Sequence, residues 1–167
     1  MCDFKENGTK EREKEWKEKI EKAEHAVRVA VGTTATTGAI PIPFADMPVL
    51  IAQQVALMAT ISGIFEMDIK KDGLKGFVMA VLGVGGAALV GKTVAANLLK
   101  WIPVAGSLAG GAISAGTAGT ITWAMGEAYI EVCKAVKMGK LNEEDIGKEK
   151  GIGFFKDAFQ AQIKYRE

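Results

Sequence analysis

One octapeptide of this 167-residue chain has the spacing of a phosphate-binding loop. Residues 86–93 read GAALVGKT and fit G-x-x-x-x-G-K-[ST], with Gly86 and Gly91 as the two fixed glycines. In such a loop the lysine, here Lys92, holds the terminal phosphates, and the hydroxyl of Thr93 would hold magnesium. The loop needs a strand before it, and no later segment predicts the second strand that ends in a magnesium-binding Asp. We therefore interpret these glycines as helix-packing residues, and a small P-loop protein that uses Lys92 is the less favoured alternative.

The remaining reactive side chains form no recognisable catalytic or metal-binding arrangement. His25 is the single histidine and lies in a strongly charged segment, where we expect it to face solvent. Cys2 and Cys133 lack the spacing of a metal or redox motif. Glu127 and Glu131 lie one helical turn apart, where we expect the helix to return to water. We predict no catalytic residue, no metal site and no cofactor, and hence a protein that is not an enzyme.

Charge is balanced overall but very unevenly placed along the chain. The 21 basic and 20 acidic residues give a net charge of +1, which argues against a nucleic-acid partner. Residues 1–28 hold 16 charges, residues 29–133 hold 11, and residues 134–167 hold 14. A centre so poor in charge is either buried or in contact with lipid. Reduced cysteines and a charged N-terminal run favour the cytoplasmic side, with association to an inner membrane left open.

The elements that would position these residues are all helical. We expect a charged helix over 10–31, an apolar helix over 47–66, long helices over 74–101 and from Pro103 to 137, a short turn after Asn142, and an amphipathic helix over 152–165. Pro41 and Pro43 break the chain between the first two helices, and Asp46 is placed to cap the second. The predicted fold class is all-α, one domain over 1–167 with an arm (1–31), an apolar core (32–137) and a C-terminal amphipathic part (138–167).

Small residues recur every four positions in the two long helices. Gly inside a helix costs about 1 kcal/mol relative to Ala, so these rows need a structural reason. Close backbone packing is that reason, because small residues let two helices approach each other. We therefore expect two helical hairpins with close-packed faces, which would also permit homo-oligomers. The residues concerned are Gly83, Ala87 and Gly91 in one helix, and Gly106, Gly110, Ser114, Gly111, Ala115 and Gly119 in the other.

The first expected helix carries one narrow apolar seam, suited to docking on the body of the protein or to pairing with another chain, and docking is the favoured interpretation. Trp16, Ile20, Ala23, Val27 and Ala30 follow a 4-3-4-3 spacing, which predicts a narrow apolar face that docks on the body of the protein. Spanning a membrane needs roughly 20 apolar residues, and the stretch from Trp101 to Gly126 is long enough but contains few large aliphatic side chains. A membrane-associated hairpin and a compact soluble bundle are therefore equally favoured by the residues alone.

Two segments resemble an uncharacterised bacterial helical domain. Residues 30–68 contain the corner IPIPFAD followed by an apolar helix with Gln53, and residues 98–132 contain a second Ile-Pro corner, a Gly/Ala-rich helix and Gly126-Glu127-Ala128. That domain often follows Era-type GTPase domains and is also seen in YcjF-type inner-membrane proteins. The resemblance, over about residues 19–163, implies an α-helical, membrane-linked accessory module. The resemblance does not imply nucleotide binding, because the GTPase motifs of that family lie in a separate domain.

The favoured function is a non-enzymatic helical accessory module that associates with a membrane or with a protein partner such as a GTPase. The alternative is a soluble helical protein with a regulatory or interaction role, in which the Gly-rich helices only form the core. Recovery as a soluble monomer or tight nucleotide binding that depends on Lys92 would separate these alternatives from the favoured function.

Overall fold

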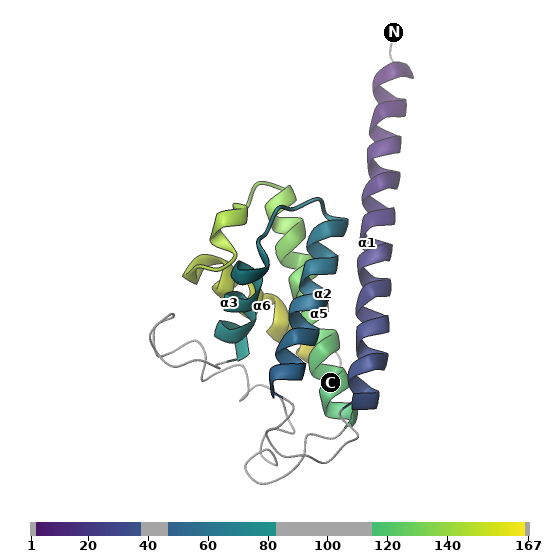
Figure 1. Ribbon diagram of the computed structural model, residues 1–167. Helices are drawn as coiled ribbons and strands as arrows, with labels where there is room; N and C mark the ends of the chain where they lie inside the picture. Colours follow the sequence, from purple (N-terminus) through teal and green to yellow (C-terminus); the bar gives the residue numbers. More distant parts are fainter. Residues whose placement is uncertain (1–2, 38–46, 83–114, 166–167) are drawn as a thin grey trace.

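The computed structural model describes residues 3–37, 47–82 and 115–165, and within these ranges the chain is helical and has no β-strand (Figure 1). The prediction of an all-α bundle is therefore confirmed. The elements are α1 (Asp3–Thr37), α2 (Met47–Ile64), α3 (Lys71–Leu82), α5 (Ala115–Lys137), the 3-10 turn η3 (Glu143–Asp145) and α6 (Glu149–Tyr165).

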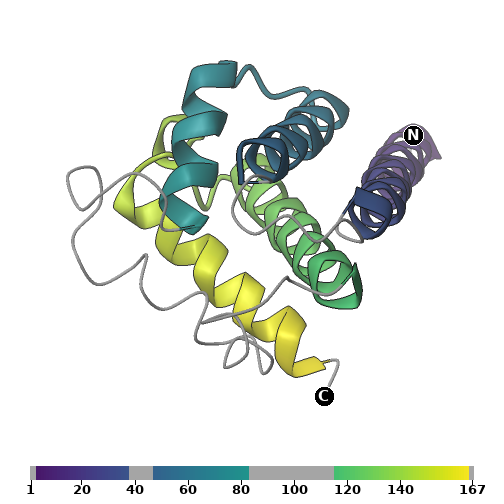
Figure 2. The same cartoon turned by 60° about the horizontal axis from the view of Figure 1, so that its bottom comes forward.

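Helix α5 occupies the middle of the bundle and contacts α1, α2 and α6. Helix α3 packs on α2 and α6, on the side of the bundle away from α1 (Figure 2). Helix α1 runs beside α2 and α5, and its N-terminal part extends well beyond the other helices (Figure 1). The bundle is thus a compact body with one long helix along its side.

The apolar seam predicted on α1 is the face that docks. Ala23 and Val27 are completely buried, and Trp16 meets the ring of Phe65 edge-on with 5.6 Å between centroids. The charged residues between them face solvent, because a helix of period 3.6 separates the two faces. The helix is longer than the predicted 10–31: it begins at Asp3 and continues to Thr37. Other bounds moved by a few residues: α2 ends at Ile64, α3 begins at Lys71 and α6 at Glu149.

An aromatic cluster forms the centre of the core between α3, α5 and α6. The Phe77 ring lies 5.8 Å from that of Tyr129 and 5.2 Å from that of Phe155, and Phe155 stacks on Phe159 at 6.2 Å. All four side chains are at most 2% exposed. Aromatic residues make up only 7% of the chain, so a large share of them is concentrated where three helices meet. This cluster fixes how α3 and α6 sit on α5.

Close packing of a glycine occurs in α5, against α1. A Cβ atom at Gly126 would lie 2.5 Å from Cγ2 of Val27 and 2.9 Å from its Cγ1. A second close approach lies at Gly151 of α6, where a Cβ would come within 2.2 Å of the carbonyl oxygen of Asp145. The absence of a side chain at these two positions is therefore what brings α1 onto α5 and α6 onto the preceding turn.

Most of the small residues predicted to pack lie outside the described residues. Of the two rows, Ala115 and Gly119 fall within α5, and Gly119 is buried. The others that fall outside are Gly83, Ala87, Gly91, Gly106, Gly110, Gly111 and Ser114, together with the corner residues Pro41, Pro43, Asp46 and Pro103. The pairing of the two Gly-rich segments with each other stays a prediction.

Candidate functional site

The reactive side chains noted in the sequence do not come together. His25 is exposed on α1, as expected, whereas Cys133 is completely buried in α5. Burial raises the pKa of the Cys133 thiol and of the neighbouring Tyr129 hydroxyl, so both stay protonated at neutral pH. Among the described residues no three His, Cys, Asp or Glu side chains are placed to share a metal ion. Residues Gly86, Gly91, Lys92 and Thr93 of the P-loop pattern lie outside the described ranges.

Two buried hydrogen bonds join α2 to α5. Gln54 donates from Nε2 to Oγ1 of Thr122 at 2.8 Å, and the hydroxyls of Ser62 and Tyr129 lie 2.8 Å apart. Each bond satisfies a donor and an acceptor that would otherwise cost about 1–3 kcal/mol to bury, whereas the buried Oε1 of Gln54 has no partner among the described residues. The two pairs fix the register of an apolar helix that has no charged residue of its own. Sequence analysis missed them, because nothing in the sequence links Gln54 to a partner 68 positions away.

Glu127 is the most unusual carboxylate of the described chain. It is half-buried in α5 beside α1, next to the close contact at Gly126. Burial raises its pKa, the nearby carboxylates of Glu24 and Glu131 raise it further, and the positive charges of Arg28 and Lys134 act against that. Glu131 is itself paired with Lys134 at 2.6 Å and is 42% exposed, as expected for a helix that returns to water. Glu127 departs from that expectation because α1 covers it.

We expect Glu127→Gln to stabilise the fold at neutral pH. The folded pKa lies above the ordinary value of 4.5, so the protonated carboxyl is favoured in the folded state. That contribution is present at acidic pH and is lost as the pH rises through the folded pKa. The variant should therefore have a higher melting temperature than the wild type at pH 7, and the difference should shrink below pH 4.5.

Glu131→Gln is the matched control for this prediction, because it removes the same charge one turn away but breaks the contact with Lys134. Its melting temperature at pH 7 should rise less than that of Glu127→Gln, because the lost contact with Lys134 offsets the relief of the repulsion between Glu131 and Glu127. Thermal melts of both variants between pH 4 and pH 8 make the comparison, and an equal gain for both would show that net charge, not the position of Glu127, is responsible.

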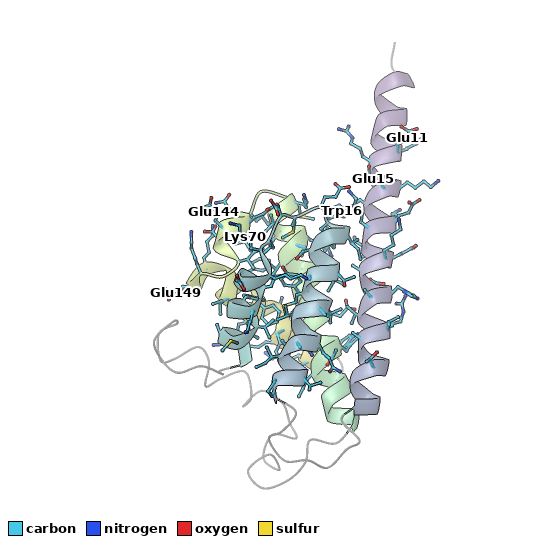
Figure 3. All side chains as sticks on the ribbon, viewed as in Figure 1. Glu11, Glu15, Trp16, Lys70, Glu144 and Glu149 are labelled. Carbon is cyan, nitrogen blue, oxygen red and sulfur yellow. The ribbon has the colours of Figure 1, made fainter. Side chains whose placement is uncertain are left out.

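One end of the bundle is closed by charged and polar contacts. At the turn after α2, the Lys19 ammonium lies 3.1 Å from the carboxylate of Glu66, and Lys137 donates to the carbonyl oxygen of Glu66 at 3.1 Å. The backbone amide of Asp68 donates to Glu143 at 3.3 Å. Figure 3 shows labelled charged residues of this end, including Lys70 and Glu144. We call this part of the molecule the charged end.

The opposite end is free of charge on four helices. The segments concerned, which we call the uncharged end, are residues 29–37 of α1, 47–60 of α2, 76–82 of α3 and 115–126 of α5. The C-terminal ends of α1 and α3 and the N-terminal ends of α2 and α5, which these segments include, lie at the lower side of Figure 1 and come forward in Figure 2. Side chains exposed here include two large aliphatic ones, Val29 (57% exposed) and Val49 (47% exposed), with Ala52 and Ala56 beside Val49 on α2. This end is the best candidate for an interaction surface.

None of the described helices has the length and hydropathy needed to cross a membrane. The uncharged end is therefore a surface made of several helix ends and one helix face. No single long apolar span is found in the described residues. The described side chains of this end could enter an apolar or interfacial environment without carrying a charge into it, whereas Asp46, Lys92 and Lys100 belong to the connecting segments outside the described ranges.

Comparison with known proteins identifies a family to which the chain is similar. The model of a domain of unknown function, DUF697, matches residues 3–149, which includes α1 to η3. No curated protein and no solved structure gave a significant match.

Proposed function

The chain belongs to the DUF697 family of domains of unknown function. We propose that it is a non-enzymatic accessory module that docks on a membrane surface through its uncharged end. The module would act at the cytoplasmic face of an inner membrane. What supports the proposal is the separation of charge along the bundle: four helices contribute uncharged segments to one end, and the polar contacts close the other.

The exposed aliphatic side chains make it favourable to transfer this end of the bundle out of water. Val29 and Val49 are among the few large apolar residues that the described chain exposes, and both belong to the uncharged end. A surface of this kind can bury its apolar side chains at the level of the lipid headgroups without spanning the bilayer. The buried pairs between α2 and α5 keep the exposed face of α2 in place, because they fix the register of the helix from inside.

We expect Val29→Asp and Val49→Asp, alone and together, to release the protein from vesicles. Each substitution replaces an aliphatic contact by a charge that would have to enter the interface, and each should weaken binding by roughly tenfold. Flotation of the purified protein with vesicles of phosphatidylethanolamine and phosphatidylglycerol measures the effect.

Met138→Asp is the matched control, because Met138 is 55% exposed but follows α5 at the charged end. It should float like the wild type. A wild-type protein that stays at the bottom of the gradient, or a loss with Met138→Asp equal to that with Val49→Asp, would contradict the proposal.

A protein partner such as an Era-type GTPase is the second candidate. It is favoured by the N-terminal part of α1, which extends beyond the bundle and whose residues 10–15 are all exposed (Figure 3). Titration of a purified Era-type GTPase domain with the full chain and with a chain lacking residues 3–14 tests it. Binding that survives the deletion would rule out this part of α1 as the contact.

A further inference from the structure

The charged residues that border the uncharged end are basic on three helices. Counting back from this end, the first charged residue is Arg28 on α1, Lys75 on α3 and Lys164 on α6, whose C-terminal end lies on the same side (Figure 2). All three are exposed. On α5 the first charged residue is Glu127, which is half-buried against α1, and α2 has no charged residue before Glu66 at the other end. We call Arg28, Lys75 and Lys164 the basic border.

These three side chains are available to an outside anion. The Arg28 side chain is 64% exposed, and its contact with Glu24, at 3.9 Å, is long and open to water. Such a pair contributes little and is easily exchanged. Lys75 and Lys164 form no ion pair within the described residues. At the charged end, in contrast, acidic and basic residues alternate, as in the pairs Lys148–Glu144 and Lys150–Asp145.

The basic border lies back from the ends of α1 and α3 and close to the end of α6. Nine residues follow Arg28 in α1, seven follow Lys75 in α3 and one follows Lys164 in α6. At 1.5 Å per residue the first two segments are about 14 and 10 Å long. Helices that lie at an interface bury their apolar part about 5–10 Å deep, so Lys75 would lie near the level of the phosphates, Arg28 on their water side and Lys164 below them. Long basic side chains can also reach toward the phosphates from slightly below them.

We propose that the uncharged end recognises an anionic bilayer, with Val29 and Val49 entering the interface and the basic border contacting lipid phosphates. This proposal rests on the proposed function and specifies the lipid class that it takes. The whole chain carries a net charge of only +1, so selectivity for anionic lipid depends on where the basic residues lie. Each basic side chain near an anionic surface strengthens binding by about fivefold, so the three together should contribute roughly 100-fold.

Flotation with two kinds of vesicle tests the proposal: pure phosphatidylcholine, and phosphatidylcholine with one third phosphatidylglycerol. The wild type should bind the anionic vesicles roughly 100-fold more tightly, and added salt should reduce the difference. The triple variant Arg28→Gln, Lys75→Gln, Lys164→Gln should bind both kinds with the weaker affinity. The matched control removes the same charge from exposed lysines distant from this end, as Lys10→Gln, Lys14→Gln, Lys140→Gln, and should keep the preference.

The outcomes separate this inference from the proposed function. If the wild type binds both vesicles equally and Val49→Asp releases it from both, membrane docking stands and the basic border is refuted. An equal loss in the triple variant and its control would also refute the basic border, because net charge alone would then explain the preference. If the wild type binds neither vesicle, docking and lipid recognition are both refuted. The same surface would then be expected to bind an acidic protein partner.

Discussion

Gly126→Leu should detach α1 from α5 and lower the free energy of unfolding by about 3 kcal/mol. A Cβ at this position would lie 2.5 Å from Cγ2 of Val27, and Val27 is completely buried, so its side chain has no free space to enter. The longer leucine side chain would have to displace the whole of α1 from this contact. The gain in helix propensity, about 1 kcal/mol at most, is too small to offset that displacement.

Urea unfolding followed by circular dichroism measures this loss. In a background in which Trp101 and Trp123 are replaced by Phe, the emission of Trp16 reports separately on the docking of α1, because its ring packs on Phe65. Gly32→Ala is a useful comparison, since nothing lies within 4 Å of a Cβ placed there and the substitution lies in the same helix as Val27. It should be neutral or slightly stabilising. A wild-type midpoint for Gly126→Leu would show that the contact between α1 and α5 is not tight.

Phe77→Ala should be the most damaging single truncation in the described core, at about 3–5 kcal/mol. The ring is 1% exposed and contacts both Tyr129 of α5 and Phe155 of α6. Its removal leaves a cavity at the point where three helices meet, and neither neighbouring ring can fill it without losing its own contacts. We expect α3 to lose its place on the bundle before the other helices do.

The same unfolding measurement tests this prediction, with Met79→Ala as its partner on α3. Met79 is only half-buried, so its truncation should cost clearly less. Similar losses for the two variants would mean that the aromatic cluster does not dominate the packing of α3.

Periodicity was enough to predict the helical class and the docking face of α1. The 4-3-4-3 spacing of Trp16, Ile20, Ala23, Val27 and Ala30 identifies a face, and that face is the buried one. It says nothing about the partner, because a period is a property of one helix. The neighbour of Val27 is Gly126, and apart from the presence of a glycine no pattern in the two helices indicates this pair.

The polar interior could not be predicted for a related reason. Ser62 and Tyr129 are 67 positions apart, and each has an ordinary place in its own helix. The burial of Glu127 could not be predicted either. Its position after an uncharged run indicated exposure to solvent, whereas α1 covers the side chain and burial raises its pKa. Helix bounds shifted for local reasons, as at Glu66, which takes a positive φ of 53° and ends α2 early. The sequence alone does not indicate which distant segments pack against each other.

The tight contact between Val27 and Gly126 also bears on the order in which the chain assembles. Helices α2 and α3 are joined by a short turn, and so are α5 and α6 through η3, so each of these pairs can meet after closing only a small loop. The contact between α1 and α5 joins segments about 100 positions apart, and the entropy lost on closing a loop rises with its length. We expect α1 to attach last during folding and to open first under denaturant, without the body of the bundle unfolding. A chain built this way can expose the buried face of α1 at a lower cost in free energy than that of complete unfolding.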